Sequence, residues 1–530
     1  MITETPRPEA TEREPAVAGP SRPAVVAVAV AAVVVAGLVL RFWTRSQLWL
    51  DEALTVNIAR VPLHRLPTAL RHDGAPPLYY AVLHLWMRAF GTSNVAVRSL
   101  SAVCSVACLP LMWLAGRRVG RSAGADPAVT GTVALVLLAS SPFAIRYATE
   151  ARMYSLVVLL TVIGYLALSR LLSSPSLHPV DVVGFGLVCG LLVLTQYWAL
   201  YLVGVLALVL LWQAWRSVAP LRRERARVAL VALAAGMVLF VPWLPTFYYQ
   251  LRHTGTPWSG RSSFAAMVNA VSQFAGGSSS TGRALGLLFF ALAGFGLFGL
   301  ALDTHRVEID LRTRPRGRAL AIVVGGTLAV AVALGLISGG AFQARYAAVV
   351  FAPFLLLVVL GTTVFLDRRV LAGVVAVACV CGLATASGNV TSQRTQAGVL
   401  AGALRQQYRP GDLIAYCPDQ LGPAVSRLLP ASFTQVTFPR RTGPAFVDWV
   451  DYAKVNGAAD PDAFARYLDA RAGPSHAVWL VWAAEYRTFG AKCQEAADLL
   501  GTLRPPANQL IEEDPTNYYE HANLVRFPGK

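Results

Sequence analysis

Long apolar runs separated by short polar segments dominate the sequence from Pro23 to about Gly388. Most of these runs are long enough to cross a hydrocarbon core, which requires roughly 20 residues of helix. The pattern predicts eleven transmembrane helices, at Pro23–Leu40, Val97–Gly116, Ala128–Ile145, Tyr154–Leu172, Val182–Tyr197, Leu200–Trp215, Val228–Trp243, Ala284–Leu302, Ala319–Ile337, Ala347–Leu366 and Val370–Ala386. We therefore expect a polytopic α-helical membrane protein.

Composition agrees with this interpretation and excludes an ordinary soluble enzyme. Hydrophobic residues make up 55% of the 530 residues, charged residues only 14%, and the mean hydropathy is +0.51. The formal net charge of +17, taken alone, would suit a nucleic-acid-binding protein. Many arginines, however, fall in short loops between apolar runs, where they act as orientation signals, so we expect no nucleic-acid partner.

Charge along the chain predicts its orientation in the membrane. Residues 1–22 are rich in Pro and Glu, which predicts a disordered tail followed by a retained helix instead of a cleaved signal. Short arginine-rich loops face the cytoplasm, so the tail is expected there, whereas the first loop (42–96) and the loops with Glu150 and Arg345 are expected outside the plasma membrane. Four arginine groups share the cytoplasmic side: Arg117, Arg118 and Arg121; Arg216, Arg222, Arg223, Arg225 and Arg227; Arg312, Arg314, Arg316 and Arg318; Arg368 and Arg369.

The apolar stretch Pro76–Phe90 could be counted as a further span, which would place its two flanks on opposite faces of the membrane. It has only 15 residues and begins with two prolines. Polar His84 and Arg88 lie on one helical face and Leu78 and Val82 on another, as in a helix that lies at the membrane interface. We therefore predict an amphipathic interfacial helix here.

Residues 389–530 differ from the transmembrane domain at 23–388 in being more polar. Short β-type runs at Asp412–Cys417, Thr434–Phe438 and Ala477–Trp482 alternate with helical stretches and predict a small extracytoplasmic α/β domain. Cys417 and Cys493 are the two cysteines of this domain, and outside the cytoplasm they are expected to form a disulfide.

The strongest chemical signal is the segment Leu48-Trp49-Leu50-Asp51-Glu52, in which two adjacent carboxylates follow the first span. Acidic residues at a membrane surface usually have a function, although a helix N-terminus also favours acids. Three further features emerge on the same predicted face, and they contain His72 and Asp73, Glu150 and Arg152, and Arg345 and Tyr346. The predicted site therefore combines acids with arginines.

This combination suits transfer from a sugar phosphate. A hydroxyl acceptor becomes nucleophilic when a carboxylate takes its proton, and an arginine stabilises the charge on the departing phosphate. We predict Asp51, paired with Glu52, as the catalytic base and Arg345 as the phosphate clamp. Simpler alternatives stay open. Glu150 and Arg152 could form only a helix-end salt bridge, and Arg345 could anchor its helix at the lipid headgroups. His72 and Asp73 could be turn residues before Pro76 and Pro77.

The cytoplasmic side lacks the motifs that would bind a cytosolic nucleotide sugar. We find no P-loop, no Gly-rich dinucleotide fingerprint and no paired acids in the arginine-rich loops. A donor that arrives in the bilayer, such as a polyprenyl-phosphate sugar, meets the requirement. No zinc-type His and Cys spacing is present, so no structural metal and no cofactor are predicted, and dependence on a divalent metal stays open.

The ordered set of motifs resembles the GT-C superfamily of membrane glycosyltransferases, in the branch of protein O-mannosyltransferases and the aminoarabinose transferase of lipid A. The resemblance covers Pro23 to Leu366 and rests on Leu-Trp-Leu-Asp-Glu, Asp73-Gly-Ala-Pro-Pro-Leu-Tyr-Tyr80, Ser141-Pro-Phe through Glu150-Ala-Arg-Met-Tyr154, and Arg345-Tyr346. It implies an inverting transfer of mannose or an arabinose-like sugar from a polyprenyl phosphate to a cell-envelope protein, glycolipid or polysaccharide, with Asp51 as base. Substrate contacts are expected from His72, Asp73, Tyr80, Glu150, Arg152, Tyr154, Arg345 and Tyr346. Ala75 and Met153 depart from the family, which often has His and Pro there.

Other classes of protein have similar patterns. A transporter or flippase for lipid-linked sugars is also polytopic, but carriers place charges near the bilayer midplane and often contain repeats, which this sequence does not show. A non-catalytic scaffold for envelope assembly is a third alternative. In the C-terminal domain, Trp449, Tyr452, Trp479 and Trp482 could stack on sugar rings, although a role in the domain core or at the membrane is the stronger expectation.

Overall fold

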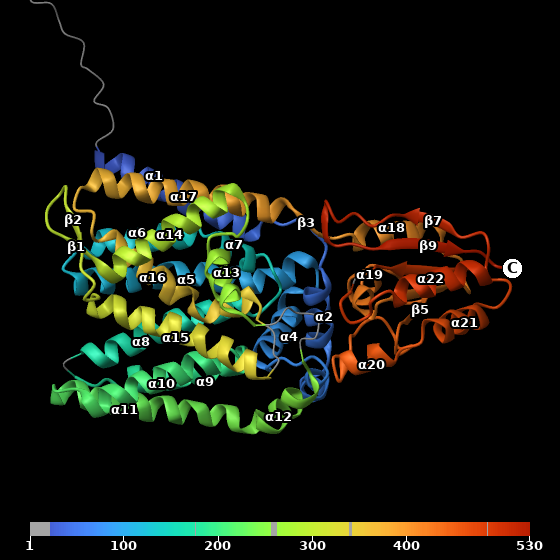
Figure 1. Ribbon diagram of the computed structural model, residues 1–530, viewed down its shortest axis with the longest axis horizontal. Coiled ribbons are helices and arrows are strands. Elements are labelled where there is room, and N and C mark those ends of the chain that lie inside the picture. The colour runs from blue at the N-terminus through green and yellow to red at the C-terminus, as the bar shows by residue number, and fades with distance from the viewer. Residues whose placement is uncertain (1–21, 175, 256–261, 339–341, 485) are drawn as a thin grey trace, which may run out of the picture.

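The protein consists of a long helical bundle with a mixed α/β domain at one end (Figure 1). The structure, a computed structural model, describes residues 22–174, 176–255, 262–338, 342–484 and 486–530. Residues 1–21 of the predicted N-terminal tail lie outside the described residues. Helices α2 and α4 of the first loop lie where the bundle meets the C-terminal domain (Figure 1).

The bundle contains the helices that the apolar runs predict. Within the described ranges, nine elements are long and apolar enough to span a membrane: α1 (Arg22–Phe42), α5 (Asn94–Ala123), α8 (Tyr154–Ser173), α10 (Ala199–Arg216), the run α11 (Pro220–Met237), η2 (Val238–Trp243) and α12 (Leu244–His253), α14 (Ser280–Phe298), α15 (Pro315–Ser338), η3 (Ala344–Ala347) with α16 (Ala348–Thr362), and α17 (Arg368–Thr391). A tenth is the bent pair α6 (Pro127–Ala139) and α7 (Pro142–Ala148), and α9 (Pro179–Thr195) is a shorter apolar helix. Each of the eleven predicted spans coincides with one of these elements, so the multi-pass helical fold is confirmed.

Two predicted spans differ from the observed helices in detail. The span predicted at Ala128–Ile145 is bent by 53° between α6 and α7, because Pro142 lacks the N–H that would continue the helical hydrogen bonds. The span predicted to reach Leu302 ends at Phe298, where the chain enters the antiparallel hairpin of β1 (Gly299–Ala301) and β2 (Val307–Ile309). One short apolar helix, α13 (Phe264–Phe274), was not predicted.

Helix α16 forms the centre of the bundle. All of its residues from Ala348 to Thr362 are buried, as expected of a helix that is apolar on every side. Helices α5, α6, α8 and α14 pack around it. Arg345, just before α16, lies 3.1 Å from Asp51 of α2, and α2 lies at the end of the bundle that faces the C-terminal domain (Figure 1).

The first loop is largely helical. It contains α2 (Leu50–Arg60), η1 (Leu63–Arg65), α3 (Leu66–Arg71) and α4 (Leu78–Phe90). Helix α4 is too short to span a membrane and is amphipathic: Tyr79, Tyr80 and Leu83 are buried, whereas Leu85 and Phe90 are exposed. These features agree with the amphipathic helix predicted for this stretch.

The C-terminal domain is built on a five-stranded mixed sheet in the order β5-β4-β6-β9-β7. Strand β4 is parallel to β5 and β6, whereas β9 is antiparallel to both of its neighbours. Its elements are β3 (Gln393–Thr395), α18 (Ala397–Gln407), β4 (Leu413–Cys417), η4 (Asp419–Leu421), α19 (Gly422–Ser426), β5 (Thr434–Thr437), α20 (Tyr452–Ala458), α21 (Pro461–Ala472), β6 (Val478–Trp482), α22 (Lys492–Leu503), β7 (Asn508–Ile511), β8 (Tyr518–Glu520) and β9 (Asn523–Phe527).

The core of this domain is apolar and crosslinked. A disulfide joins Cys417 at the end of β4 to Cys493 in α22, as the sequence predicts. Trp479, Tyr452 and Trp449 are all buried, which favours the core role for these aromatic residues over sugar stacking. Strand β3 pairs with β8 and connects the end of α17 to the C-terminal segment.

Candidate active site

The predicted acidic pair occupies the first turn of α2, at the junction of the bundle and the C-terminal domain (Figure 1). The N-cap residue, Trp49, makes no side-chain capping bond. Instead, Oε2 of Glu520 in β8 accepts a hydrogen bond of 3.3 Å from the backbone N–H of Leu50. A residue 470 positions away in the chain therefore caps the helix that carries both carboxylates.

Asp51 lies between two arginines. Its Oδ2 is 3.1 Å from Nη1 of Arg345 and 4.0 Å from Nη2 of Arg152. Arg152 also donates to the hydroxyl of Thr55, one turn further along α2, at 2.8 Å. The Asp51 side chain is 17% exposed, so the carboxylate is close to two positive charges and still accessible to a substrate.

Glu52 has a different environment and is fully buried. Arg98 donates to both carboxylate oxygens, from Nε at 2.7 Å and from Nη2 at 2.6 Å, and the N–H of Ala151 donates at 2.9 Å. Burial raises the pKa of Glu52, but the charge and hydrogen bonds of Arg98 outweigh it and hold the pKa below its ordinary value. Glu52, which we predicted beside Asp51 in the catalytic pair, is therefore buried in an ionic network, whereas Asp51 is partly exposed.

Glu150 belongs to the same buried ionic network as Glu52. Arg394 in β3 lies 3.8 Å from both carboxylates, and Arg146 lies 3.6 Å from Glu150. The helix-end pair considered for Glu150 and Arg152 does not form, since their side chains pair with different residues. Arg152 turns toward Asp51, whereas Glu150 helps to join the loop before α8 to the start of the C-terminal domain.

Asp73 lies beside the site. The hydroxyl of Tyr80 donates to its Oδ2 at 2.7 Å. Burial raises the pKa of Asp73, and the nearby Arg152 opposes this effect. The turn depends on Gly74, whose φ of +82° lies in the left-handed region that favours glycine.

His72 contacts the C-terminal domain. Its Nδ1 is 2.8 Å from Oδ1 of Asp448, and its backbone carbonyl accepts from the N–H of Trp449. A parallel contact joins His253 in α12 to Asp451 at 3.3 Å. These contacts make His72 part of the junction between the two domains rather than part of the group around Asp51.

Aromatic side chains surround Arg345. Its guanidinium lies 5.7 Å from the ring centroid of Trp49 and 5.8 Å from that of Tyr346, distances that permit cation–π attraction. Tyr154 is fully buried and packs 4.6 Å from Tyr147, and its hydroxyl has no hydrogen-bond partner among the described residues. Tyr154 is therefore a buried residue, whereas Tyr346 is half-buried beside Arg345.

Three residues of the site were not predicted from the sequence. Arg98 could have been noticed as a charge near the start of an apolar helix. Arg394 and Glu520 belong to a domain whose sequence gives no sign of contact with Asp51 or Glu52. Among the described residues, no group of three His, Cys, Asp or Glu side chains is arranged to hold a metal ion.

Comparisons with known proteins agree with this architecture. Residues 74–245 match the model of a family described as dolichyl-phosphate-mannose-protein mannosyltransferase. A comparison with curated protein sequences gives no match.

Solved structures give matches over nearly the whole chain. ArnT from Cupriavidus metallidurans bound to undecaprenyl phosphate is similar with a TM-score of 0.59 and 15% identity, over 95% of this chain and 98% of that chain. The apo state of the same enzyme gives a TM-score of 0.60, 14% identity and the same coverage. The apo oligosaccharyltransferase of Archaeoglobus fulgidus gives a TM-score of 0.50 and 12% identity, over 93% of this chain and 74% of that chain. The chain therefore has the fold of these solved structures over nearly its whole length, and its residues 74–245 match the mannosyltransferase family model.

Proposed function

We propose that this protein is an inverting glycosyltransferase that moves a mannose or arabinose-like sugar from a polyprenyl phosphate to a hydroxyl group of a cell-envelope protein, glycolipid or polysaccharide. The observation that carries the proposal is the ion pair of Asp51 and Arg345, with Oδ2 and Nη1 3.1 Å apart, at the end of the bundle. One group can accept a proton and the other can hold a phosphate. Both are partly exposed and come from elements far apart in the chain.

The reaction assigns one task to each group. The acceptor oxygen attacks the anomeric carbon from the face opposite the phosphate, while its proton passes to Asp51. The bond between the anomeric carbon and the phosphate oxygen breaks, and the polyprenyl phosphate leaves with the bonding electrons. Arg345, supported by Arg152, stabilises the growing negative charge on that phosphate. A single displacement of this kind inverts the anomeric configuration.

The positive charge of Arg345 and the ligands named for similar proteins both indicate the class of sugar donor. Without a substrate, Asp51 neutralises Arg345, and an arriving phosphate would take over this arginine and release the carboxylate for base catalysis. The ArnT structure was solved with undecaprenyl phosphate, and the family description names dolichyl-phosphate-mannose. Both support a lipid-linked phosphate sugar as the donor.

We place the site on the extracytoplasmic face. The arginine-rich segments lie at the end of α5 and at the starts of α11 and α17, at the end of the bundle far from α2 (Figure 1). Short arginine-rich loops face the cytoplasm. The disulfide of the C-terminal domain also suits an oxidising compartment.

The proposal is tested with the purified full-length chain, polyprenyl-phosphate-linked mannose or arabinose carrying a radiolabel, and isolated envelope fractions as acceptors. Asp51→Asn should abolish labelling of the acceptor, because an amide has nearly the same shape but cannot accept the proton. The matched control is Asp181→Asn: Asp181 is 14% exposed and pairs with Arg170 at 3.7 Å at the start of α9. This control should transfer normally.

Normal transfer by Asp51→Asn would refute the role of Asp51. If the wild-type chain moved labelled lipid across vesicle membranes and transferred sugar to no acceptor, the protein would be a carrier and the enzymatic proposal would fail.

A further inference from the structure

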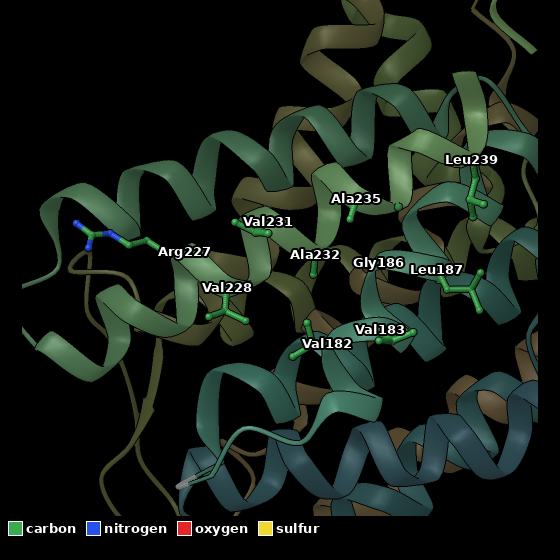
Figure 2. A pocket seen from close by; sticks show the side chains of 11 residues that line it. Val182, Val183, Gly186, Leu187, Arg227, Val228, Val231, Ala232, Ala235 and Leu239 are labelled. Carbon is green, nitrogen blue, oxygen red and sulfur yellow. The ribbon is translucent and has the colours of Figure 1, made fainter. Parts of the chain in front are cut away.

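A lateral groove lies between α9 and α11 (Figure 2), and none of the residues described around Asp51 lines it. It encloses about 520 Å³, and apolar side chains such as Val182, Leu187, Val231 and Leu239 form nearly all of its lining. Arg227 is the only charged residue among those that line it. The groove follows α11 and the start of η2 from Arg227 to Leu239. This is about 18 Å of helix, close to one leaflet of a hydrocarbon core roughly 30 Å thick.

Small residues explain why the groove exists. A Cβ atom on Gly186 of α9 would collide with the carbonyl oxygen of Ala232 in α11, and a Cβ on Gly236 would collide with the carbonyl of Gly186. The two backbones therefore touch at these glycines. Larger side chains, including Val183 and Leu187, project on the outer side of this contact and border a furrow that it leaves open (Figure 2).

Arg227 places a positive charge at one end of the groove. Its aliphatic stem borders the apolar lining, and its guanidinium points along α11 away from that lining (Figure 2). The side chain is exposed, and within the described ranges it has neither an ion-pair partner nor a hydrogen-bond partner. Helix α11 contains three further arginines near its start and a single acid, Glu224, so this end of the groove has an excess of positive charge.

We propose that this groove binds one anionic phospholipid, with its phosphate on Arg227 and an acyl chain against the apolar lining. An arginine at a helix end extends its charge to the headgroup level, and basic pockets between spanning helices bind anionic headgroups. The apolar groove alone would accept the acyl chain of any lipid. The unpaired Arg227 favours a lipid whose headgroup is negatively charged. Asp51 lies at the opposite end of the bundle, so this lipid is not the sugar donor and the inference does not depend on the proposed reaction.

The role of the Arg227 charge is tested by native mass spectrometry of the full-length chain in mild detergent. Phosphatidylglycerol or phosphatidylcholine with identical acyl chains is added to the protein. The wild-type chain should retain one phosphatidylglycerol more tightly than phosphatidylcholine. Arg227→Gln should weaken phosphatidylglycerol binding by about fivefold, the usual effect of one arginine near a membrane surface. The matched control Arg222→Gln changes an exposed arginine of the same helix that does not line the groove, and it should bind as the wild type does.

The role of the apolar lining of the groove is tested with a second pair of variants. Ala235 lines the groove, whereas its neighbour Ala234 is exposed on the same helix and does not. Ala235→Phe should fill the furrow and lower retention of both lipids, and Ala234→Phe should leave retention unchanged.

Three results would overturn the inference. If Arg227→Gln and Arg222→Gln lost the same amount of phosphatidylglycerol binding, the lipid would be attracted to the whole basic segment of α11 and not to Arg227 in particular. Unchanged retention in Ala235→Phe would place the acyl chain elsewhere. Stoichiometric displacement of phosphatidylglycerol by undecaprenyl phosphate would make the groove a site for the lipid carrier.

Discussion

Replacing Glu52 by Gln should destabilise the protein strongly, in contrast to the same kind of change at Asp51. The carboxylate of Glu52 is 0% exposed and accepts two charge-assisted hydrogen bonds from Arg98, which is itself only 4% exposed. A neutral amide has one acceptor oxygen and no charge, so Arg98 would keep a buried positive charge whose remaining partners are backbone carbonyls such as that of Ser46. Breaking one side of a buried ion pair costs about 3–5 kcal/mol.

This cost converts into a measurable change in melting temperature. If the chain of 530 residues unfolds as one unit, with an entropy of about 2 cal/mol/K per residue, the midpoint should fall by about 3–5 °C. The assay is thermal unfolding of purified protein in detergent, followed by the fraction that still elutes as a monodisperse peak. Asp181→Asn, which removes a partly exposed ion pair, should cost about 0–1 kcal/mol and shift the midpoint by about 1 °C at most.

A Glu52→Gln variant that is as stable as the wild type but inactive would refute the structural role of Glu52. It would return this residue to the catalytic pair that the sequence alone suggested.

Three further predictions concern the site and its surroundings. Arg345→Gln should lower kcat by about 10²–10³-fold, the usual effect of losing one donor to a developing anion, and an unchanged kcat would remove Arg345 from the reaction. Burial, with the nearby carboxylates of Asp51 and Glu52, raises the pKa of Glu520 to about 8 from its ordinary 4.5, so the wild type should lose stability as the pH rises from about 4.5 through 8, by at most about 1.4 kcal/mol per pH unit. The midpoints of Glu520→Gln across this range should lack this slope, and parallel curves for the two proteins would contradict the assignment. In a cysteine-accessibility experiment, a cysteine at position 51 should react with a membrane-impermeant reagent added to intact cells, and reaction from the cytosolic side alone would reverse the proposed orientation.

The sequence by itself determined the membrane part of the fold. Runs of about 20 apolar residues can satisfy their backbone hydrogen bonds in a bilayer only as helices, so the eleven predicted spans reappear as observed elements. The same physics distinguished α4, because its length and its two-faced pattern do not suit a spanning helix. Details that depend on one residue, such as the bend at Pro142, were within reach of the sequence but were not predicted.

The sequence also identified Asp51, Arg152 and Arg345 as candidate residues, because charges at the ends of apolar helices are costly and therefore conspicuous. It did not distinguish Asp51 from Glu52, since two adjacent residues of a helix differ by about 100° in direction. Only packing decided that one carboxylate would face Arg345 at the surface and that the other would be buried against Arg98.

Only the tertiary structure showed that the C-terminal domain takes part in the site. Glu520 caps α2 and Arg394 joins Glu52 to Glu150, yet neither residue stands out in a polar domain where charged side chains are common. Local sequence predicts local structure because its hydrogen bonds and periodicity span only a few residues. Contacts between residues hundreds of positions apart depend on how the whole chain packs, and that packing decides which of the candidate charges lie together.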